Sequence, residues 1–283
     1  MRTPRFFCCI LSRRELRDAC EKPMKLPDWL DTLIFDELKA RYRPKYSDMT
    51  NIDDDKEKTL NYLGTYFPRS YAESYCIFSD YFKSNQTVYS DKEEFSIFDF
   101  GSGTGGEIIG LLTVLDELLP NLKKVRIVAL DGNKDALLLY EDILAAFQQQ
   151  TRIRIDSCPT HLHISFYKLE VLDLIMTEKF DLIVSFKAIC EFVTKKQFEE
   201  RNAYEHIAKF LKPKLKNGGL MLFVDVTTYN DTSQEWLPKM MDKGLSSASC
   251  SIIGKNENYN QTYLISHSRK NSDKSKVAWR MIK

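Results

Sequence analysis

Four glycines follow a hydrophobic segment that contains an acid near its end. Residues 96–107 read Ser-Ile-Phe-Asp-Phe-Gly-Ser-Gly-Thr-Gly-Gly-Glu, with Asp99 two positions before Gly101. Glycines let the backbone turn sharply and approach a ligand closely, and free N–H groups at a helix start carry positive character. The spacing therefore predicts a loop that binds a nucleotide-like ligand. Gly101, Gly103 and Gly106 also satisfy the dinucleotide pattern G-x-G-x-x-G, so the glycines alone leave an NAD-dependent oxidoreductase open.

Asp99 helps to decide between NAD and another nucleotide-like ligand. A charged carboxylate inside an apolar segment is costly unless a cation or several donors meet it, and a pyrophosphate would repel it. Here the sequence resembles the class I S-adenosylmethionine-dependent methyltransferases, whose first motif has an acid two positions before the first of three alternating glycines. The resemblance implies S-adenosylmethionine as cofactor, with its amino-acid part supported by Asp99 and wrapped by Gly101, Ser102, Gly103, Thr104 and Gly105.

A second acid closes the next strand-like segment. Residues 125–130 read Val-Arg-Ile-Val-Ala-Leu, and Asp131 follows them. A carboxylate at the end of the second strand can accept hydrogen bonds from both ribose hydroxyls, a role that fits NAD as well. Asp131 could instead cap the following helix together with Asn133. In the methyltransferase family an acid at this point holds the ribose, so the resemblance implies that role for Asp131 and includes Gly132 in the cofactor site.

The resemblance continues over residues 95–230, nearly half of the chain. It implies an acid after the third strand, close to the adenine amino group, and Glu170 is favoured for this place over Asp173. Residues 180–184 read Phe-Asp-Leu-Ile-Val and match the family's fourth strand, with Ser185 after it included in the cofactor site.

The methyl acceptor would be expected beside residues 185–192, which follow this fourth strand. The sequence here has neither the Asn-Pro-Pro-Tyr pattern of adenine-modifying relatives nor the Pro-Cys pattern of a nucleophilic thiolate. Lys187 and Glu191 are four residues apart and would share a face on a helix, where they either orient a substrate or, as we favour, pair with each other. Cys190 is expected to be a buried, inert side chain. The acceptor class therefore stays open.

An aromatic stretch precedes the glycines. Residues 62–73 faintly resemble a family of ribosomal small-subunit methyltransferases, although Arg69 follows Pro68 in the reverse of that family's order and its cysteine cluster is missing. This resemblance implies an RNA acceptor only weakly. We expect the aromatic stripe at helical spacing to be core and not a base-stacking platform; its members are Tyr71, Tyr75, Phe78 and Phe82.

Two other groups are expected to be structural. His161 and His163 alternate on a predicted strand, but no third ligand lies near them in the sequence, so no metal is expected. Residues 268–276 contain four bases and one acid and are interpreted as the solvated loop of a hairpin, not as a phosphate site.

The elements that must position these residues follow from periodicity. A helix is predicted from Ser70, because Pro68 precedes it and Ser70 and Glu73 have capping-box spacing. Strands at 95–100, 125–130, 161–168, 180–186 and 220–226 alternate with helices at 107–119, 134–149 and 196–211. This alternation predicts an α/β Rossmann-like, doubly wound, mostly parallel sheet. Residues 249–253, 263–267 and 277–282 have short links and predict antiparallel strands at the end.

Composition limits the remaining choices. The 283 residues include 43% hydrophobic residues, enough for a large core, and 41 Lys+Arg against 40 Asp+Glu give a net charge of +1. That charge leaves a nucleic-acid partner possible but unsupported. No apolar run approaches the ~20 residues of a membrane span, so no membrane association is expected. Seven scattered cysteines without a C-x-x-C pair favour a reducing, cytoplasmic location.

We therefore expect an N-terminal helical extension over residues 1–90 that lids the cofactor cleft, and a methyltransferase domain over residues 91–283. Residues 1–25, which carry seven bases and three acids, are expected to be a solvated terminus. The expected function is methyl transfer from S-adenosylmethionine. Two alternatives stay open: an NAD-dependent oxidoreductase and a catalytically degenerate methyltransferase-fold binding module.

Overall fold

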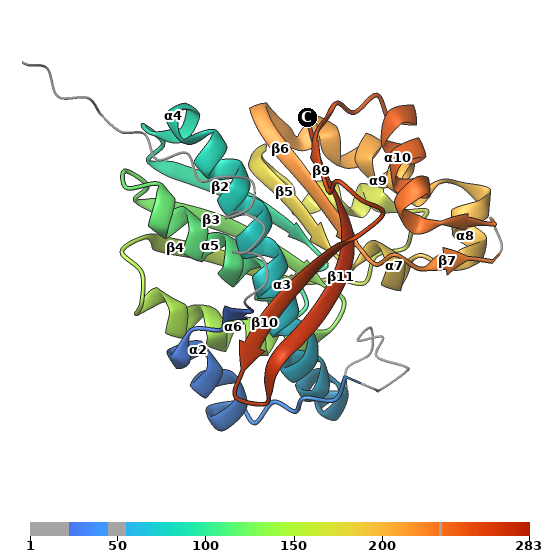
Figure 1. The fold of residues 1–283 in the computed structure, drawn as a ribbon. Helices are drawn as coiled ribbons and strands as arrows, with labels where there is room; N and C mark the ends of the chain where they lie inside the picture. Colours follow the sequence, from blue (N-terminus) through green and yellow to red (C-terminus); the bar gives the residue numbers. More distant parts are fainter. Residues whose placement is uncertain (1–22, 45–54, 232–233) are drawn as a thin grey trace, which may run out of the picture.

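The computed structural model describes residues 23–44, 55–231 and 234–283 (Figure 1). Its helices are α2 Asp28–Thr32, the π-helical turn η1 Leu33–Glu37, α3 Lys56–Ser84, α4 Gln86–Tyr89, α5 Gly106–Leu118, α6 Lys134–Gln148, the 3₁₀ turn η2 Leu169–Leu174, α7 Ile189–Phe192, α8 Lys195–Glu200, α9 Ala203–Leu211, the 3₁₀ turn η3 Lys212–Lys214 and α10 Leu237–Ser247. Its strands are β1 Met24–Lys25, β2 Glu94–Phe100, β3 Lys124–Asp131, β4 Arg154–His161, β5 Phe180–Phe186, β6 Leu215–Asp225, β7 Tyr229–Asn230, β8 Glu235–Trp236, β9 Ile252–Lys255, β10 Gln261–His267 and β11 Lys270–Ile282.

One mixed sheet organises the described residues. Its strands follow the order β1-β10-β11-β6-β5-β2-β3-β4, and β9 pairs with β11 outside this path. The strands β6, β5, β2, β3 and β4 run parallel, whereas β11 is antiparallel to both β6 and β10. The predicted Rossmann-like sheet with antiparallel C-terminal strands is thereby confirmed. Because parallel strands share one carboxyl edge, the loops after β2, β3 and β5 lie side by side.

Alternate strand residues supply two hydrophobic clusters, one on each face of the sheet. On β2, Ile97 belongs to the cluster with α3, α5 and α6, and Phe98 belongs to the cluster with α9 and α10. On β5, Leu182 belongs to the cluster of Ile97, and Ile183 belongs to the cluster of Phe98. Strands covered on both faces are typical of doubly wound α/β sheets, which explains why these segments read as continuous apolar runs.

Helix α3 differs from its prediction. It begins at Lys56 and not at Ser70, because Asp55 accepts hydrogen bonds from the backbone N–H groups of Glu57 and Lys58 and caps it. Pro68, expected to precede the helix, lies inside it. Packing of this 29-residue helix outweighs the lost backbone donor. The predicted aromatic stripe is confirmed as core in three of four places, since Tyr71, Phe78 and Phe82 are buried, and Tyr75 is partly buried with its hydroxyl donating to Glu117.

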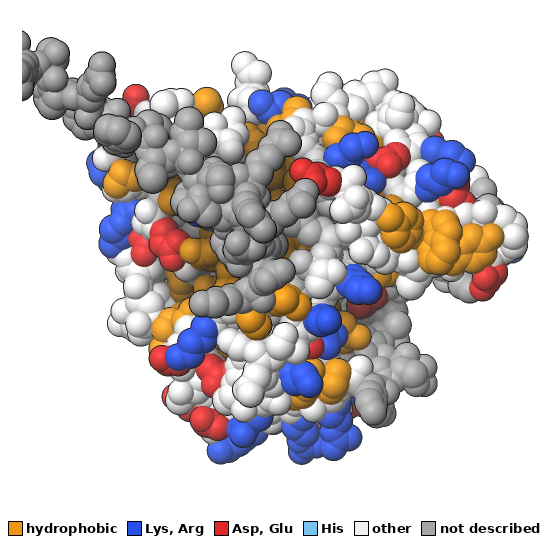
Figure 2. Space-filling model, viewed as in Figure 1, with side chains coloured by type: hydrophobic (Ala, Val, Ile, Leu, Met, Phe, Trp, Pro, Cys, Tyr) orange, Lys and Arg blue, Asp and Glu red, His pale blue; other side chains and the backbone are white. Residues whose placement is uncertain are grey.

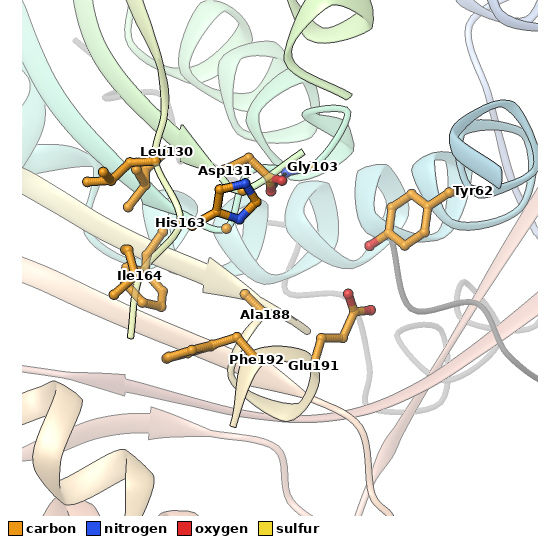
Figure 3. A pocket seen from close by; sticks show the side chains of 13 residues that line it. Tyr62, Gly103, Leu130, Asp131, His163, Ile164, Ala188, Glu191 and Phe192 are labelled. Atoms are coloured by element: carbon orange, nitrogen blue, oxygen red, sulfur yellow. Dashed lines mark hydrogen bonds between the residues drawn. The ribbon is translucent and has the colours of Figure 1, made fainter. Parts of the chain in front are cut away.

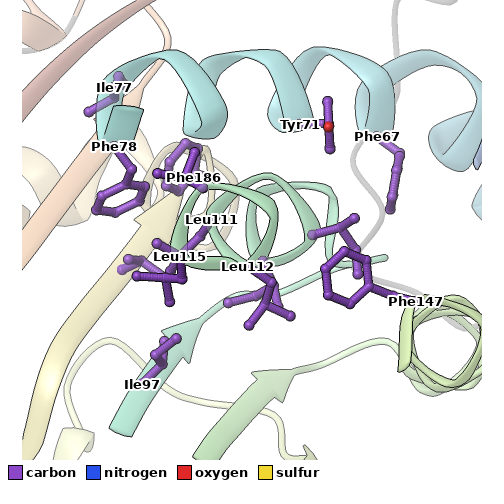
Figure 4. Close-up of a cluster of buried hydrophobic side chains, with 14 of the residues drawn as sticks. Phe67, Tyr71, Ile77, Phe78, Ile97, Leu111, Leu112, Leu115, Phe147 and Phe186 are labelled. Carbon is purple, nitrogen blue, oxygen red and sulfur yellow. The ribbon is translucent and has the colours of Figure 1, made fainter. Parts of the chain in front are cut away.

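Helices α3 and α5 pack with their backbones in close contact. A Cβ atom on Gly106 would lie 2.5 Å from the Phe67 carbonyl oxygen, and one on Gly110 would lie 2.5 Å from the Tyr71 carbonyl oxygen. Larger residues at these two glycines would force the helices apart. Figure 4 shows side chains of α3, including Phe67 and Phe78, packed against Leu111, Leu112 and Leu115 of α5, with Ile97 of β2 beneath. The glycine-rich stretch thus serves the core as well as the loop.

The third parallel strand was predicted seven residues too late. The strand β4 covers Arg154–His161 and not residues 161–168, which form a loop leading to η2. It is the edge strand of the sheet, it contains Pro159, and most of its residues are partly exposed. An edge strand tolerates proline and polar residues, so β4 lacks the apolar signature on which the prediction relied.

The C-terminal hairpin is longer than predicted. Residues 268–276, expected to be a solvated loop, mostly belong to β11, which begins at Lys270. Asp273 is buried there and accepts a bidentate pair of hydrogen bonds from Arg69, both 2.8 Å long, and a third from the Tyr42 hydroxyl. The helix predicted over residues 196–211 is also divided, because Asn202 caps α9 by accepting from two backbone N–H groups.

The N-terminal elements share the main core. Leu26, Leu30 and Ile34 belong to the same buried cluster as Ile97 of β2, and β1 pairs with β10. The expected boundary at residue 90 stays a prediction, and most of residues 1–25 lie outside the described part. In residues 23–44, 55–231 and 234–283, no helix is both long enough and apolar enough to cross a bilayer. On the face in Figure 2, Lys and Arg side chains are interspersed with Asp and Glu.

Candidate functional site

The glycine loop lies between β2 and α5 at the carboxyl edge of the sheet. Gly101, Gly103 and Gly105 have φ values of 77°, 48° and 80°, a region that favours glycine. Two of them are also in close contact with other parts of the fold. A Cβ on Gly101 would lie 2.3 Å from the Cβ of Ala188, and one on Gly105 would lie 2.3 Å from the ring of Tyr140. Only glycine therefore fits these positions.

Asp131 joins the end of β3 to this loop. One of its carboxylate oxygens accepts from the Gly103 N–H at 2.7 Å, and the other accepts from the Asn133 N–H at 2.8 Å. Burial raises the pKa of Asp131, opposed by these N–H donors and by His161. Asn133 itself caps α6 by accepting from the Ala136 N–H. Asp131 thus bonds the glycine loop and also orders the start of α6, and its ribose role stays a prediction.

A cavity opens along these residues (Figure 3). Its polar wall includes Gly101, Gly103, Asp131 and Gly132. Its apolar wall comes from the ends of β2 and β3 and from the loop after β4, with α7 and α3 completing it. The remaining described lining residues are Tyr62, Phe100, Leu130, Leu162, His163, Ile164, Ala188, Glu191 and Phe192. Figure 3 shows Leu130 and Ile164 toward one end and Tyr62 with Glu191 toward the other.

Two buried acids lie next to the loop. Asp99 is fully buried, and neither of its carboxylate oxygens has a hydrogen-bond partner among the described residues. Burial raises its pKa well above the usual range, and the nearby Glu107 raises it further. Burial likewise raises the pKa of Glu107, to about 8. Burial thus favours the uncharged form of Asp99 over the carboxylate unless a cation lies beside it. Its side chain is not part of the described cavity wall.

Lys187 forms a buried ion pair. Its Nζ atom donates to both oxygens of Glu73 at 3.0 and 2.8 Å, and the Ser275 hydroxyl donates to the same carboxylate. The expected pairing of Lys187 with Glu191 is therefore wrong. The reason is backbone geometry, because Lys187 has φ 58° and precedes α7, so it does not share a helical face with Glu191. Its pairing instead connects the end of β5 to α3 and β11.

The structure brings part of the predicted cofactor set together. Gly101, Gly103, Asp131 and Gly132 line the cavity, and so does Glu191, one of the two candidates near the acceptor. Other members are buried without being part of the described wall: Ser102, Thr104 and Gly105 in the loop, Asp99 on β2 just before it, and Ser185 near the end of β5. The hydroxyls of Ser102 and Ser185 have no partner among the described residues.

Glu170 and Asp173 lie elsewhere. Glu170 is exposed on η2, and Asp173 pairs with Lys214 on the surface. Neither belongs to the described cavity wall, where Leu162, His163 and Ile164 follow β4 instead. The third strand was expected at residues 161–168, which follow β4. The acid that should come after this strand was therefore placed too far along the chain. The adenine role of Glu170 stays a prediction.

Three interpretations of single residues can be compared with their surroundings. Cys190, expected to be buried, is partly exposed; its thiol donates to the Lys187 carbonyl at 3.1 Å, and loss of solvation raises its pKa well above the ordinary value. The exposed His161 donates to the Gly132 carbonyl at 2.9 Å, and its ring lies 5.1 Å from that of His163. Among the described residues, no three His, Cys, Asp or Glu side chains are grouped to hold a metal ion.

Sequence reasoning missed the residues that close the cavity. Tyr62 comes from the first turns of α3, which the Pro68 signal had excluded from the helix. Leu162, His163 and Ile164 were assigned to the interior of a strand and not to the loop after it. Phe192 was within the segment expected near the methyl group but was not singled out. Correct placement of β4 and of the start of α3 would have found them.

Comparisons with known proteins give structural matches only. No family model and no curated protein matches the chain. Among solved structures, magnesium protoporphyrin IX methyltransferase from Synechocystis PCC 6803 with bound SAH is 8% identical, with a TM-score of 0.47, covering 88% of this chain and 91% of that chain. Precorrin-6y C5,15-methyltransferase from Geobacter metallireducens GS-15 is 15% identical, with a TM-score of 0.43, covering 71% and 86%. Such similarity assigns no activity or substrate to this chain.

Proposed function

We propose that this protein transfers a methyl group from S-adenosylmethionine to an acceptor. The observation that supports this most is the position of Asp131, whose carboxylate lies at the end of β3, bonded to the glycine loop and facing a cavity. A ribose is the ligand part that such a carboxylate recognises through paired hydroxyls. The antiparallel β11 between β6 and β10 also departs from the all-parallel order of the dinucleotide-binding fold.

The residues of the site fit each part of this cofactor. The apolar side chains Leu130, Leu162 and Ile164 suit a planar adenine ring, which is itself poorly solvated on its faces. Beside them Asp131 would hold the ribose. Gly101 and Gly103 leave room for the amino-acid part, and their backbone conformation allows close approach.

The buried acids explain why a cationic ligand is preferred. Asp99 has two carboxylate oxygens without donors, and the pKa of the nearby Glu107 is raised as well, so an ammonium group near the loop would favour the charged forms of these acids and be stabilised by them. A pyrophosphate brings neither a donor nor a positive charge to the two oxygens of Asp99. This orphaned carboxylate is the feature of the site that a dinucleotide does not account for.

The chain's own contribution to catalysis is positional. The bound cofactor supplies an activated methyl group on a sulfonium. Ala188 and Phe192 give the cavity an apolar side that excludes water, and Tyr62 covers the glycine loop at Gly103, where a Cβ would lie 3.5 Å from its ring. Alignment of the acceptor in a dry cavity is sufficient for a reaction whose electrophile is already activated.

Calorimetric titration with S-adenosylhomocysteine and with NADH tests the proposal. We expect binding of S-adenosylhomocysteine and not of NADH. Asp131→Ala should weaken binding by about 3 kcal/mol, roughly 100-fold, because two charge-assisted hydrogen bonds to the ribose are lost. Asp173→Ala is the matched control, since that carboxylate pairs with Lys214 on the surface. Tight NADH binding, or equal losses in both variants, would reject the assignment.

A further inference from the structure

The hairpin of β10 and β11 extends beyond the carboxyl edge of the parallel strands. The strand β11 pairs with β6 only from Ala278 onward, and Ala278 lies opposite Asp225, the last residue of β6. Residues 270–277 of β11 therefore continue past the end of β6, by roughly 25 Å at the usual rise of a strand. The cavity opens at the same edge, after β2, β3 and β5. The hairpin thus projects on the side of the sheet where the cavity lies.

One face of this hairpin packs on α3, and the other face carries lysines. Asp273 of β11 is buried and accepts two hydrogen bonds from Arg69 of α3. Because side chains alternate along a strand, Lys274 and Lys276 point away from α3, and both are exposed. A third exposed lysine, Lys270, begins β11 next to the turn of the hairpin. Figure 2 shows Lys and Arg side chains along the part of the surface where Figure 1 places this hairpin.

An arginine of the N-terminal segment adds a fourth charge beside the hairpin. The Tyr42 hydroxyl donates to Asp273 of β11, which holds this segment against the hairpin. The next residue, Arg43, is exposed, and its backbone N–H donates to the Thr65 hydroxyl of α3 at 2.9 Å. Thr65 follows Tyr62 of the cavity wall by about one helical turn. We call the four cations the basic surface; they are Arg43, Lys270, Lys274 and Lys276.

No described carboxylate neutralises the basic surface. None of its four members forms an ion pair with a described residue, because the acids close to the hairpin are bound to other cations. These pairs are Asp273 with Arg69, Asp36 with Arg269, and Glu73 with Lys187. The β10 residues opposite Lys274 and Lys276 are uncharged. The net charge of +1 for the whole chain therefore conceals a local excess of positive charge.

The spacing of these charges suits a polymer of negative charges. Lys274 and Lys276 lie two residues apart on one face of a strand, roughly 6.6 Å, and Lys270 extends the row toward the turn. A lysine binds phosphate as a flexible point charge, so each one adds a similar contribution that does not depend on base sequence. A single small anion would meet only one or two of these side chains.

Two other anionic partners, a lipid surface and an acidic protein, fit this surface less well. Both would add apolar or aromatic contacts to the charge attraction. The large exposed hydrophobic side chains of the described residues lie elsewhere, on α4, α6, η2, β8 and β9 and in the loops next to η2 and β9. The basic surface contains none of them, so charge is the only attraction that it offers.

We propose that the basic surface binds the phosphate backbone of a single-stranded nucleic acid. An unpaired nucleotide is the form that can enter a nearby cavity directly, because a base inside a duplex first has to be flipped out. This binding surface goes beyond the proposed methyl transfer and does not depend on it. Only the further step, in which the bound strand is the methyl acceptor, rests on that function.

The test measures binding of the full chain to a fluorescently labelled uridylate strand of about 20 nucleotides, by anisotropy at several salt concentrations. The test variant replaces the three lysines of the hairpin and is Lys270→Gln/Lys274→Gln/Lys276→Gln. Glutamine keeps a polar side chain and removes the charge, so urea unfolding should be unchanged at these exposed positions. A nucleic-acid duplex, phosphatidylserine vesicles and a polyglutamate peptide are titrated in parallel.

A control variant removes the same amount of charge from another part of the molecule. It is Lys83→Gln/Lys179→Gln/Lys283→Gln. These three lysines are exposed, and none of them forms an ion pair with a described residue. Lys83 lies near the end of α3, Lys179 precedes β5 and Lys283 follows β11, so all three lie toward the amino edge of the sheet. The two variants have the same net charge and differ only in where the charge is lost.

We expect the hairpin variant to bind the single strand at least tenfold more weakly at about 0.1 M salt. The slope of log affinity against log salt should flatten by about 2, because each lost phosphate contact removes about 0.7. The control variant should stay within twofold of the unmodified chain. Equal losses in both variants, or no binding of the unmodified chain to the single strand, would overturn the inference.

The parallel titrations decide between the partners. Stronger binding of the unmodified chain to the duplex, the vesicles or the peptide than to the single strand would also overturn the inference. Titration with S-adenosylhomocysteine on the same samples tests the proposed function separately. If that cofactor product did not bind while the single strand did, methyl transfer would be rejected and the basic surface would stand.

Discussion

The neighbouring strands β2 and β5 each contain one serine and one aspartate. The hydrogen bonding of these side chains differs between the amino and carboxyl ends of the strand pair. At the amino end, Asp181 of β5 accepts from the N–H and the hydroxyl of Ser96 on β2, both at 2.8 Å, and from Lys92 and Lys216. At the carboxyl end, Asp99 of β2 and the hydroxyl of Ser185 on β5 have no partner among the described residues.

The pKa values of the two aspartates shift in opposite directions. Burial would raise the pKa of Asp181, but hydrogen bonds from Lys216, Lys92 and Ser96 outweigh it and hold the pKa below the ordinary value. Burial raises the pKa of Asp99, and no donor opposes it. Similar residues on adjacent strands thus form a complete set of hydrogen bonds at the amino end, whereas at the carboxyl end their buried polar atoms lack partners among the described residues. The missing hydrogen bonds lie at the carboxyl edge, where we propose that the cofactor binds.

The largest effect is expected at the completed end. Asp181→Asn removes a charge that two lysines and Ser96 surround, so the free energy of unfolding should fall by about 3 kcal/mol. Urea unfolding at pH 7 measures this. Binding of S-adenosylhomocysteine should not change, because the residue lies at the opposite end of the strand. A stability loss under 1 kcal/mol would mean that the four donors contribute little.

The opposite pattern is expected for Asp99. Asp99→Asn should leave the free energy of unfolding of the unliganded protein nearly unchanged, because burial disfavours the charged form of the native side chain and the amide is uncharged. The same change should lower S-adenosylhomocysteine affinity by about 2 kcal/mol, roughly 30-fold, since the ammonium loses a charged acceptor. Urea unfolding and calorimetry on the same sample separate the two effects. Unchanged affinity would show that the orphaned carboxylate does not serve the cofactor.

This contrast was only half visible in the sequence. The hydrophobic run around Asp99 and the glycines after it predicted the loop, because a charge in an apolar strand has few explanations. No sequence signal of this kind marks Asp181, because its donors are distant in the chain. Lys92 and Ser96 lie 89 and 85 positions before it, and Lys216 lies after it. Long-range pairing of this kind leaves no periodic signal.

The errors at the site have the same origin. Tyr62 was missed because a proline signal that usually precedes a helix was outweighed by packing between α3 and α5. The strand β4 was missed because an edge strand needs little apolar surface. The sequence did place Asp131 and the glycine loop correctly in the fold, because a carboxylate after an apolar strand and a backbone with positive φ are local signals, while their roles toward a cofactor stay a proposal.

A pH series sharpens the comparison of the two ends. The folded-state pKa of Glu107 is about 8 and exceeds its unfolded value, so the folded protein keeps a proton that the unfolded chain releases above about pH 4.5. Stability of the unliganded protein should therefore fall between pH 5 and 8, by at most about 1.4 kcal/mol per pH unit from this group. Glu107→Gln should flatten that decline, as measured by urea unfolding at several pH values.

The lowered pKa of Asp181 acts in the other direction. Its contribution to stability is complete above the unfolded pKa of an aspartate and is lost as the pH falls below about 4. Asp181→Asn should therefore reduce the loss of stability in acid, with Asp273, whose pKa is also lowered, contributing the rest, and leave the decline above pH 5 in place. If Glu107→Gln altered only the acid side, the assignment of the two titrations to the two ends would be reversed.

The smallest effect comes from the two serines. Ser96→Ala should lower the free energy of unfolding by about 1.5 kcal/mol, because its hydroxyl donates to the charged Asp181 carboxylate at 2.8 Å. Ser185→Ala should change it by less than 0.5 kcal/mol, because that buried hydroxyl has no partner among the described residues and its removal leaves no donor or acceptor unpaired. Both strand positions are buried, so the size of the cavity left by the missing oxygen is matched. Equal losses in the two variants would show that packing, and not the completeness of hydrogen bonding, distinguishes the two ends of the strand pair.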